Sequence, residues 1–110
     1  MSQSFDEISV DDLELVLQSG GRLIDVREPD EYAAGHVPSA RLVPLGEVAD
    51  RVAECVGDGG TTYVICRSGA RSGAACEHLA SLGHQVINVA GGTLAWIMSG
   101  RDVVEGNSPT

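Results

Sequence analysis

Short strand-like runs alternate along this chain with segments in which apolar residues repeat at helical spacing, and this alternation limits the folds that the chain can form. Residues 23–26 form a short apolar run that ends in charge, residues 61–65 are an unbroken run of β-favouring residues, and residues 85–89 form a third such run after Gly83, which is typical of buried strands. A further short strand is expected at residues 40–43. Strands that alternate with helices predict an α/β fold, with a mostly parallel central sheet and helices on both of its faces.

Helical segments lie between and around these runs. The first covers residues 10–19, because Ser9 and Asp12 resemble a capping box and apolar residues repeat as far as a glycine pair. The second is expected over residues 45–56, where apolar side chains share one helical face, and the third begins near residues 71–73 and ends before Gly83. A last short helix contains Trp96, which we expect to pack in the core. Residues 28–38, EPDEYAAGHVP, predict a loop with one helical turn.

The size and charge of the chain restrict its organisation and its partners. It has 110 residues, of which 43% are hydrophobic, and this fits one domain, which we place at residues 1–100, followed by a polar tail at residues 101–110 that is expected to fray. A formal net charge of −9 argues against nucleic acid and anionic membranes as partners. No leader-like segment opens the sequence and no apolar run approaches the roughly 18 residues of a membrane span, so we expect a cytoplasmic protein.

The segment that constrains function is YVICRSGARS, residues 63–72, in which a predicted strand runs into a cysteine and two arginines. Residues 66–71 would wrap around the strand end, with Gly69 available for an unusual backbone angle. The converging amides, the following helix N-terminus and the guanidinium groups of Arg67 and Arg71 would form an anion site that favours the thiolate of Cys66. We therefore predict an activated sulfur nucleophile that requires no metal and no organic cofactor. The alternative is an inert buried cysteine, with both arginines paired to surface carboxylates.

Two charged residues and a histidine are further candidates near this site. Asp25 and Arg27 end a strand beside the loop and are secondary candidates, either as pocket residues or as parts of a local ion pair with Glu28 or Glu31. His36 is expected to brace its own loop rather than to act as a base for the cysteine.

The two remaining cysteines are expected to be structural. Cys55 and Cys76 lie on apolar helical faces and should pack in the core, although a resolving-disulfide role for Cys76 is an alternative. The three cysteines have neither a disulfide-framework spacing nor a zinc-ligand spacing, so no metal site is expected.

Three segments resemble the rhodanese-like sulfurtransferase family in its single-domain form: LIDVREPDEYAAGHVPSA (23–40), YVICRSGARS (63–72) and VINVAGGTLAWIMSG (86–100). They occur in the family's order and spacing and, with the intervening helices, cover nearly the whole chain apart from the tail. The resemblance implies that Cys66 accepts a sulfane sulfur from thiosulfate or a persulfide such as glutathione persulfide, and passes it to cyanide, a thiol or a protein cysteine. It also implies that the other loop residues hold the persulfide and the anionic donor: Arg67, Ser68, Gly69, Ala70 and Arg71. Ser39 stands where the family often has glycine and Leu42 where it often has a polar residue, which bears on donor preference.

The length of the loop distinguishes sulfur transfer from phosphate chemistry. Cysteine phosphatases and related arsenate reductases require five residues between the cysteine and the arginine, whereas four separate Cys66 from Arg71 and Ser72 takes the phosphatase arginine's place. The shorter loop should exclude the bulkier phosphate or arsenate, which makes that chemistry the weaker alternative. The same loop suits either an enzyme that turns over small donors or a carrier module that delivers persulfide to one dedicated protein.

Overall fold

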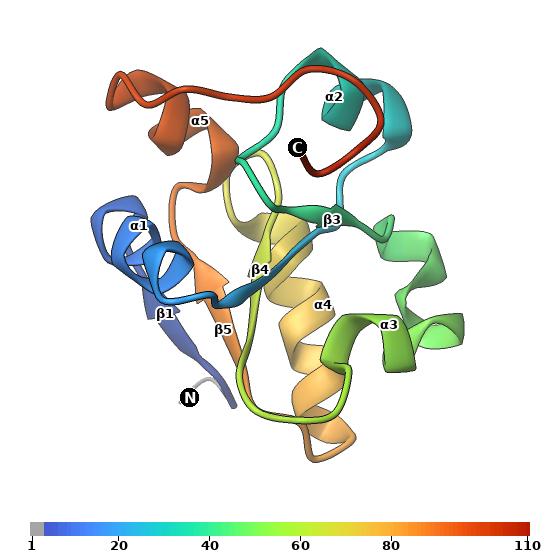
Figure 1. The fold of residues 1–110 in the computed structure, drawn as a ribbon. Helices are drawn as coiled ribbons and strands as arrows, with labels where there is room; N and C mark the ends of the chain where they lie inside the picture. The colour runs from blue at the N-terminus through green and yellow to red at the C-terminus, as the bar shows by residue number, and fades with distance from the viewer. Residues whose placement is uncertain (1–3) are drawn as a thin grey trace.

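A five-stranded parallel sheet runs through the centre of the computed structural model, which describes residues 4–110 (Figure 1). The strand order is β1-β5-β4-β2-β3, and every neighbouring pair is parallel. The strands are β1 (Asp6–Ile8), β2 (Arg22–Asp25), β3 (Arg41–Leu42), β4 (Thr62–Ile65) and β5 (Val86–Val89). Because all the strands point the same way, their carboxyl ends share one edge of the sheet, and the connections that carry function in such folds lie at that edge.

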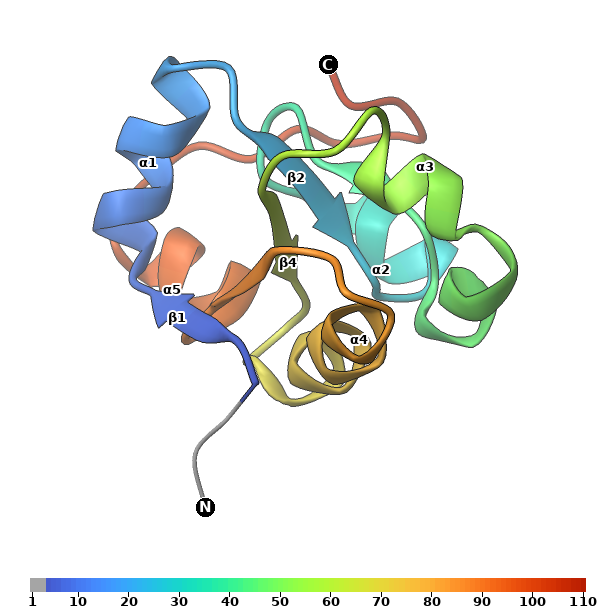
Figure 2. The ribbon, with the colours of Figure 1, turned by 90° about the horizontal axis from the view of Figure 1, so that it is seen from below.

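Helices cover both faces of the sheet, as the sequence predicts. They are α1 (Val10–Gln18), α2 (Pro29–Ala34), the 3-10 helix η1 (Leu45–Asp50), α3 (Val52–Val56), α4 (Ala70–Ser81) and α5 (Gly92–Met98). Helices α1 and α5 lie on one face and α3 and α4 on the other, each with its own cluster of buried side chains (Figure 2). Trp96 is 5% exposed and belongs to the cluster on the face that α1 and α5 cover, which confirms its predicted place in the core. None of the helices within residues 4–110 has the length and apolar character that crossing a bilayer requires.

Three elements differ from the sequence-based expectations. The helix expected over residues 45–56 is divided at Arg51, whose φ of −125° and ψ of 33° interrupt the helix between η1 and α3. The side chain of Arg51 forms ion pairs with Glu47 before the break and Glu54 after it, so a pattern that looks continuous in sequence spans two short helices. Strand β1 was not predicted, because two of its three residues are exposed acids at the edge of the sheet. The single helical turn expected within residues 28–38 is the six-residue helix α2.

The C-terminal tail packs against the domain, so the prediction that it frays is wrong. The backbones of His36 and Val104 exchange two hydrogen bonds of 2.9 and 2.8 Å, and the Gly106 N–H donates to the Ala33 carbonyl at 2.8 Å. The buried His36 ring stacks on Tyr32, and its two nitrogens each lie 2.8 Å from a carbonyl oxygen, one of Tyr32 and one of Ser108. The prediction that His36 braces its loop is confirmed, and the tail is the segment that it holds.

Candidate active site

Cys66 lies directly after β4, at the edge where the carboxyl ends of the strands meet and where α2 and α5 approach (Figure 1). The residue is 1% exposed, whereas Arg67 and Ser68 after it are exposed. Gly69 has a φ of 113°, in the left-handed region that favours glycine, and it serves as the N-cap of α4. Since α4 begins at Ala70, slightly earlier than predicted, the loop proper is only residues 66–69.

The sulfur of Cys66 accepts hydrogen bonds from two directions. The Gly69 N–H lies 3.1 Å from Sγ, which agrees with the predicted convergence of loop amides on the cysteine. The hydroxyl of Ser72, a residue with 0% exposure, lies 3.2 Å from Sγ and also 3.2 Å from the Gly69 carbonyl. The single Ser72 hydroxyl proton has two possible acceptors, and a negatively charged sulfur is the stronger one. Ser72 was not predicted as a site residue; its only signal was a small hydroxyl residue in the first turns of a helix that follows a cysteine.

These contacts stabilise the thiolate of Cys66. Burial opposes ionisation, but hydrogen bonds from the Ser72 hydroxyl and from the N–H groups of Ser72, Gly69 and Ser68 outweigh it, so the pKa of the Cys66 thiol lies below its usual value. Burial raises the pKa of Cys76 to about 12 and also raises the pKa of Cys55. Both of those residues are free, fully buried thiols in the core, as predicted. Among the three cysteines, activation is confined to Cys66.

The other side of the loop is held by β5 and α5. The Thr93 N–H and hydroxyl donate to the Cys66 carbonyl at 2.9 and 3.1 Å, and the Asn88 side-chain amide donates to the Gly69 carbonyl at 3.1 Å. Gly92 approaches so closely that a Cβ atom there would lie 2.5 Å from the Cys66 carbonyl oxygen. None of these three supports was predicted, because the Gly-Gly pair indicated only the start of a helix.

The two arginines of the loop segment lie in different environments. Arg71 donates to both carboxylate oxygens of Glu31 at 2.7 and 2.9 Å, across the space between α4 and α2. This pair lowers the pKa of Glu31 to about 2 and raises that of Arg71. Arg67 is exposed, and its side chain helps to line a groove beside the loop. The charge of Arg71 is therefore offset by a carboxylate, as the alternative interpretation of the sequence had it, while that of Arg67 faces the mouth of the site.

Asp25 and Arg27 form a buried ion pair with each other, and the structure gives neither of them the ion pair with Glu28 or Glu31 that was the alternative to a pocket role. The Arg27 guanidinium contacts both Asp25 carboxylate oxygens at 2.8 to 3.1 Å, and their side chains are 7% and 0% exposed. Arg27 also donates to the carbonyls of Glu31 and Gly35, at 3.3 and 2.9 Å. Because these contacts link the end of β2 to both ends of α2, they give the pair a supporting role next to the site.

The groove beside the cysteine loop has a volume of about 230 Å³ and lies between α2 and α5. It is lined by Arg27, Glu31, Ala34, Arg67, Thr93, Leu94 and Ile97. Leu94 and Ile97 are 38% and 49% exposed, so apolar surface continues from the groove onto α5. An open, partly apolar groove, which we call the mouth of the site, thus lies next to the loop that holds the buried, activated thiol.

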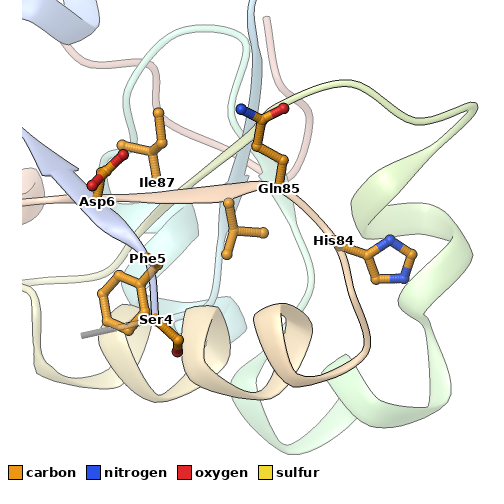
Figure 3. Close-up of a pocket in the computed structure, with 7 residues that line it drawn as sticks. Ser4, Phe5, Asp6, His84, Gln85 and Ile87 are labelled. Carbon is orange, nitrogen blue, oxygen red and sulfur yellow. The ribbon is translucent and has the colours of Figure 1, made fainter. Parts of the chain in front are cut away.

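A second hollow, of about 270 Å³, lies where β1 and β5 begin, at the opposite end of the parallel strands from Cys66. It is lined by residues 4–6 and 84–87, and Figure 3 shows His84 turned away from the other labelled side chains. The residues that line it include no cysteine, no arginine and no helix N-terminus.

Comparisons with known proteins agree with this arrangement. Residues 9–99 match the family described as Rhodanese-like domain. The chain is 39% identical over 83 residues to a protein of Allochromatium vinosum named Sulfurtransferase, covering 74% of this chain and 77% of that protein. It is 43% identical over 70 residues to Thiosulfate sulfurtransferase PspE of Escherichia coli, covering 63% and 67% of the two chains. The solved structure of a rhodanese-related protein from Thermoplasma volcanium superposes with a TM-score of 0.83 at 33% identity, over 91% of this chain and 98% of that one. With its parallel sheet, its cysteine loop and a family match over most of its length, this chain belongs to the rhodanese-like domain family.

Proposed function

We propose that this protein is a rhodanese-type sulfurtransferase in which Cys66 takes a sulfane sulfur from thiosulfate or a persulfide and passes it to a thiophilic acceptor. One observation carries the proposal: the buried Cys66 sulfur accepts hydrogen bonds from the Gly69 N–H and the Ser72 hydroxyl. These donors favour a thiolate, which is the nucleophilic form of the side chain. The names of the Allochromatium and Escherichia coli relatives support the same activity.

The proposed reaction has two half-reactions. In the first, the Cys66 thiolate attacks the outer sulfur of the donor; a new S–S bond forms, the donor's S–S bond breaks, and its electron pair leaves on sulfite or a thiolate. In the second, the acceptor attacks the outer sulfur of the Cys66 persulfide, and the electron pair of that S–S bond returns to Cys66. The two steps balance without an external oxidant or reductant.

The loop residues have distinct roles in this proposal. The N–H groups of Ser68 and Gly69, which already favour the thiolate, would stabilise the negative charge of the persulfide. The loop N-terminal to Ala70 is short, and the buried position 72 holds a hydroxyl, not a guanidinium. A single sulfur atom therefore suits this loop better than a phosphate group, whose transfer requires several cationic or amide donors around three oxygens.

Intact mass measurement tests the proposal directly. The protein is treated with thiosulfate or glutathione persulfide and weighed before and after addition of cyanide. We expect the gain of one sulfur atom, its loss to cyanide as thiocyanate, and no gain in Cys66→Ser. Cys76→Ser is the matched control and should load normally, because burial keeps the Cys76 thiol protonated. Sulfur loading that persists in Cys66→Ser would refute the proposal.

The acceptor is tested with the loaded protein. Cyanide or a small thiol that discharges Cys66 in repeated cycles would support an enzyme of small-molecule turnover. Discharge only by a protein cysteine would instead support the carrier module, which uses the same loop.

A further inference from the structure

The mouth of the site is poorer in positive charge than the sequence suggests. All seven basic residues are arginines, and five of them form ion pairs with carboxylates: Arg27, Arg41, Arg51, Arg71 and Arg101. A sixth, Arg22, donates to the Thr62 hydroxyl and the Gly59 carbonyl at the beginning of β4, away from the cysteine. Within residues 4–110, Arg67 is the one arginine beside the loop to which the structure gives no acidic partner.

Glu31 is the residue that removes one cation from the loop segment. Its carboxylate engages two N–H groups of Arg71 in parallel, and it also accepts a hydrogen bond from the Glu28 N–H at 3.0 Å, which holds it at the start of α2. Glu31 also lines the groove to which Arg67 of the cysteine loop contributes, so a donor that enters the groove meets its carboxylate. Because the Arg71 guanidinium keeps the pKa of Glu31 at about 2, this charge is constant over the physiological range.

The shape of the groove complements this charge distribution. Its wall includes the side chains of Ala34, Leu94 and Ile97, which offer apolar contact but no hydrogen bonds. Thiosulfate is small and carries two negative charges at its reacting end, and it has no group to place against that wall. An organic persulfide or thiosulfonate carries one negative charge at the reacting end and brings an organic group.

We propose that Glu31 determines the donor preference of the cysteine loop: by pairing with Arg71 it leaves one uncompensated cation, Arg67, at the mouth, and so favours singly charged organic sulfur donors over thiosulfate. This inference rests on the proposed sulfurtransferase function. Glu31 acts on the donor through Arg71 and through its own charge, so it is a positioning residue and not a catalytic one.

Toluenethiosulfonate and thiosulfate form a suitable pair of probes. In both, the Cys66 thiolate attacks the outer sulfur, the S–S bond breaks, and its electron pair leaves on toluenesulfinate or sulfite, respectively. The wild-type protein should have the higher kcat/KM with toluenethiosulfonate. The opposite order in the wild-type protein overturns the inference, whatever any variant does.

Glu31→Gln is the central variant, because glutamine keeps an oxygen for the Glu28 N–H but removes the charge. Loss of one negative charge about 6 Å from a dianion in water improves its binding about tenfold, and that of a monoanion about threefold. We expect the thiosulfate KM to fall about tenfold with kcat unchanged, and the toluenethiosulfonate KM to fall about threefold. Glu31→Asp, which keeps the carboxylate, should retain the wild-type ratio of the two donors.

Asp30→Asn is the matched control, since it removes one exposed carboxylate from the same helix. Its two KM values should each stay within about twofold of wild type, because the charge of an exposed, solvated carboxylate is screened. If Glu31→Gln gives the same ratio of thiosulfate KM to toluenethiosulfonate KM as Asp30→Asn, Glu31 does not determine the donor preference. That result would leave the sulfurtransferase proposal itself intact. Failure of both donors to load sulfur on wild-type Cys66 would instead refute the sulfurtransferase proposal itself.

Discussion

Ser72→Ala tests the origin of the reactivity of Cys66. The substitution removes one hydroxyl, which lies 3.2 Å from the sulfur, and leaves the backbone N–H donors in place. Ser72 is fully buried within α4, where alanine is the better helix former, so the fold should tolerate the change. The variant therefore isolates the side-chain contribution to the stability of the thiolate.

The size of the effect follows from the geometry. A hydrogen bond to a charged acceptor contributes about 1.5–3 kcal/mol, and about 1.4 kcal/mol corresponds to a change of one in pKa. The Ser72 proton has the Gly69 carbonyl as an alternative acceptor at the same 3.2 Å, so the lower end applies. We expect the pKa of Cys66 to rise by about 1 in Ser72→Ala.

The rate of alkylation by iodoacetamide, followed by intact mass across the pH range, measures this change. At pH values below the Cys66 pKa of both proteins, the thiolate population of Ser72→Ala is about tenfold smaller than that of wild type. Each thiolate of the variant is about threefold more nucleophilic, because its pKa is higher. The net rate of alkylation therefore falls about threefold. At pH values above both pKa values, where both proteins are ionised, the variant should react about threefold faster. Curves that cross in this way distinguish a change in pKa from a general loss of access.

Ser68→Ala is the control, because Ser68 is exposed and only its backbone N–H stabilises the thiolate. It should reproduce the wild-type curve. If Ser72→Ala also reproduces the wild-type curve, the Ser72 hydroxyl does not stabilise the thiolate and the backbone N–H groups alone account for the reactivity of Cys66.

The lowered pKa of Cys66 also links folding to pH. At pH values between its folded and unfolded pKa, the native protein binds fewer protons at Cys66 than the unfolded chain does. The resulting stabilisation is complete above the unfolded pKa and is lost as the pH falls through the folded pKa. Urea unfolding of wild type and Ser72→Ala at several pH values should therefore show a smaller increase in unfolding free energy with pH for the variant.

Two further substitutions test the support of the site. Arg27→Met leaves its buried carboxylate partner uncompensated and should lower the free energy of unfolding by about 3–5 kcal/mol in urea titrations. The exposed ion pair of Arg41 is the comparison, and Arg41→Met should cost less than about 1 kcal/mol. Gly92→Ala places a Cβ atom 2.5 Å from the Cys66 carbonyl at a φ of 59°, so sulfur loading measured by mass should fall severely. Gly46→Ala, in open space, should load as wild type does, and equal loading by both glycine variants would show that the close approach is unimportant.

The sequence was sufficient for the parts of the fold that depend on local periodicity. Helix α1, its Ser9 cap and four of the five strands follow from patterns within about ten residues. The tail could not be predicted in this way, because backbone groups make most of its contacts to residues 33–39 and composition does not encode such pairing. The break at Arg51 could not be predicted from the apolar pattern, because η1 and α3 both contribute apolar residues to the same buried cluster and the pattern therefore looks like that of one helix.

The site was predictable where function lies in one continuous segment and not where it depends on distant partners. Cys66 and Gly69 follow from the loop alone. Glu31 lies 40 positions from Arg71, and the two meet only because parallel strands bring α2 and the start of α4 to the same edge of the sheet. Ser72 is within the quoted motif, but its importance depends on a hydroxyl pointing back toward the cysteine, which only the geometry of the helix determines.

The sequence attributes both the stability of the thiolate and the binding of an anionic donor partly to the two arginines, and the structure assigns these two properties to different groups. Thiolate stability comes from N–H and hydroxyl donors within about 3.2 Å of a buried sulfur, where water does not screen them. The guanidinium groups are partly or fully exposed, and one is paired to Glu31, so we expect their main effect to fall on the charge of the approaching donor. Ser72 should therefore control how readily Cys66 reacts, and Glu31 which donor it accepts. Because the two residues act on different properties of the site, Ser72→Ala should change the alkylation rate by the same factor with or without Glu31→Gln, and Glu31→Gln should change the donor preference by the same factor with or without Ser72→Ala.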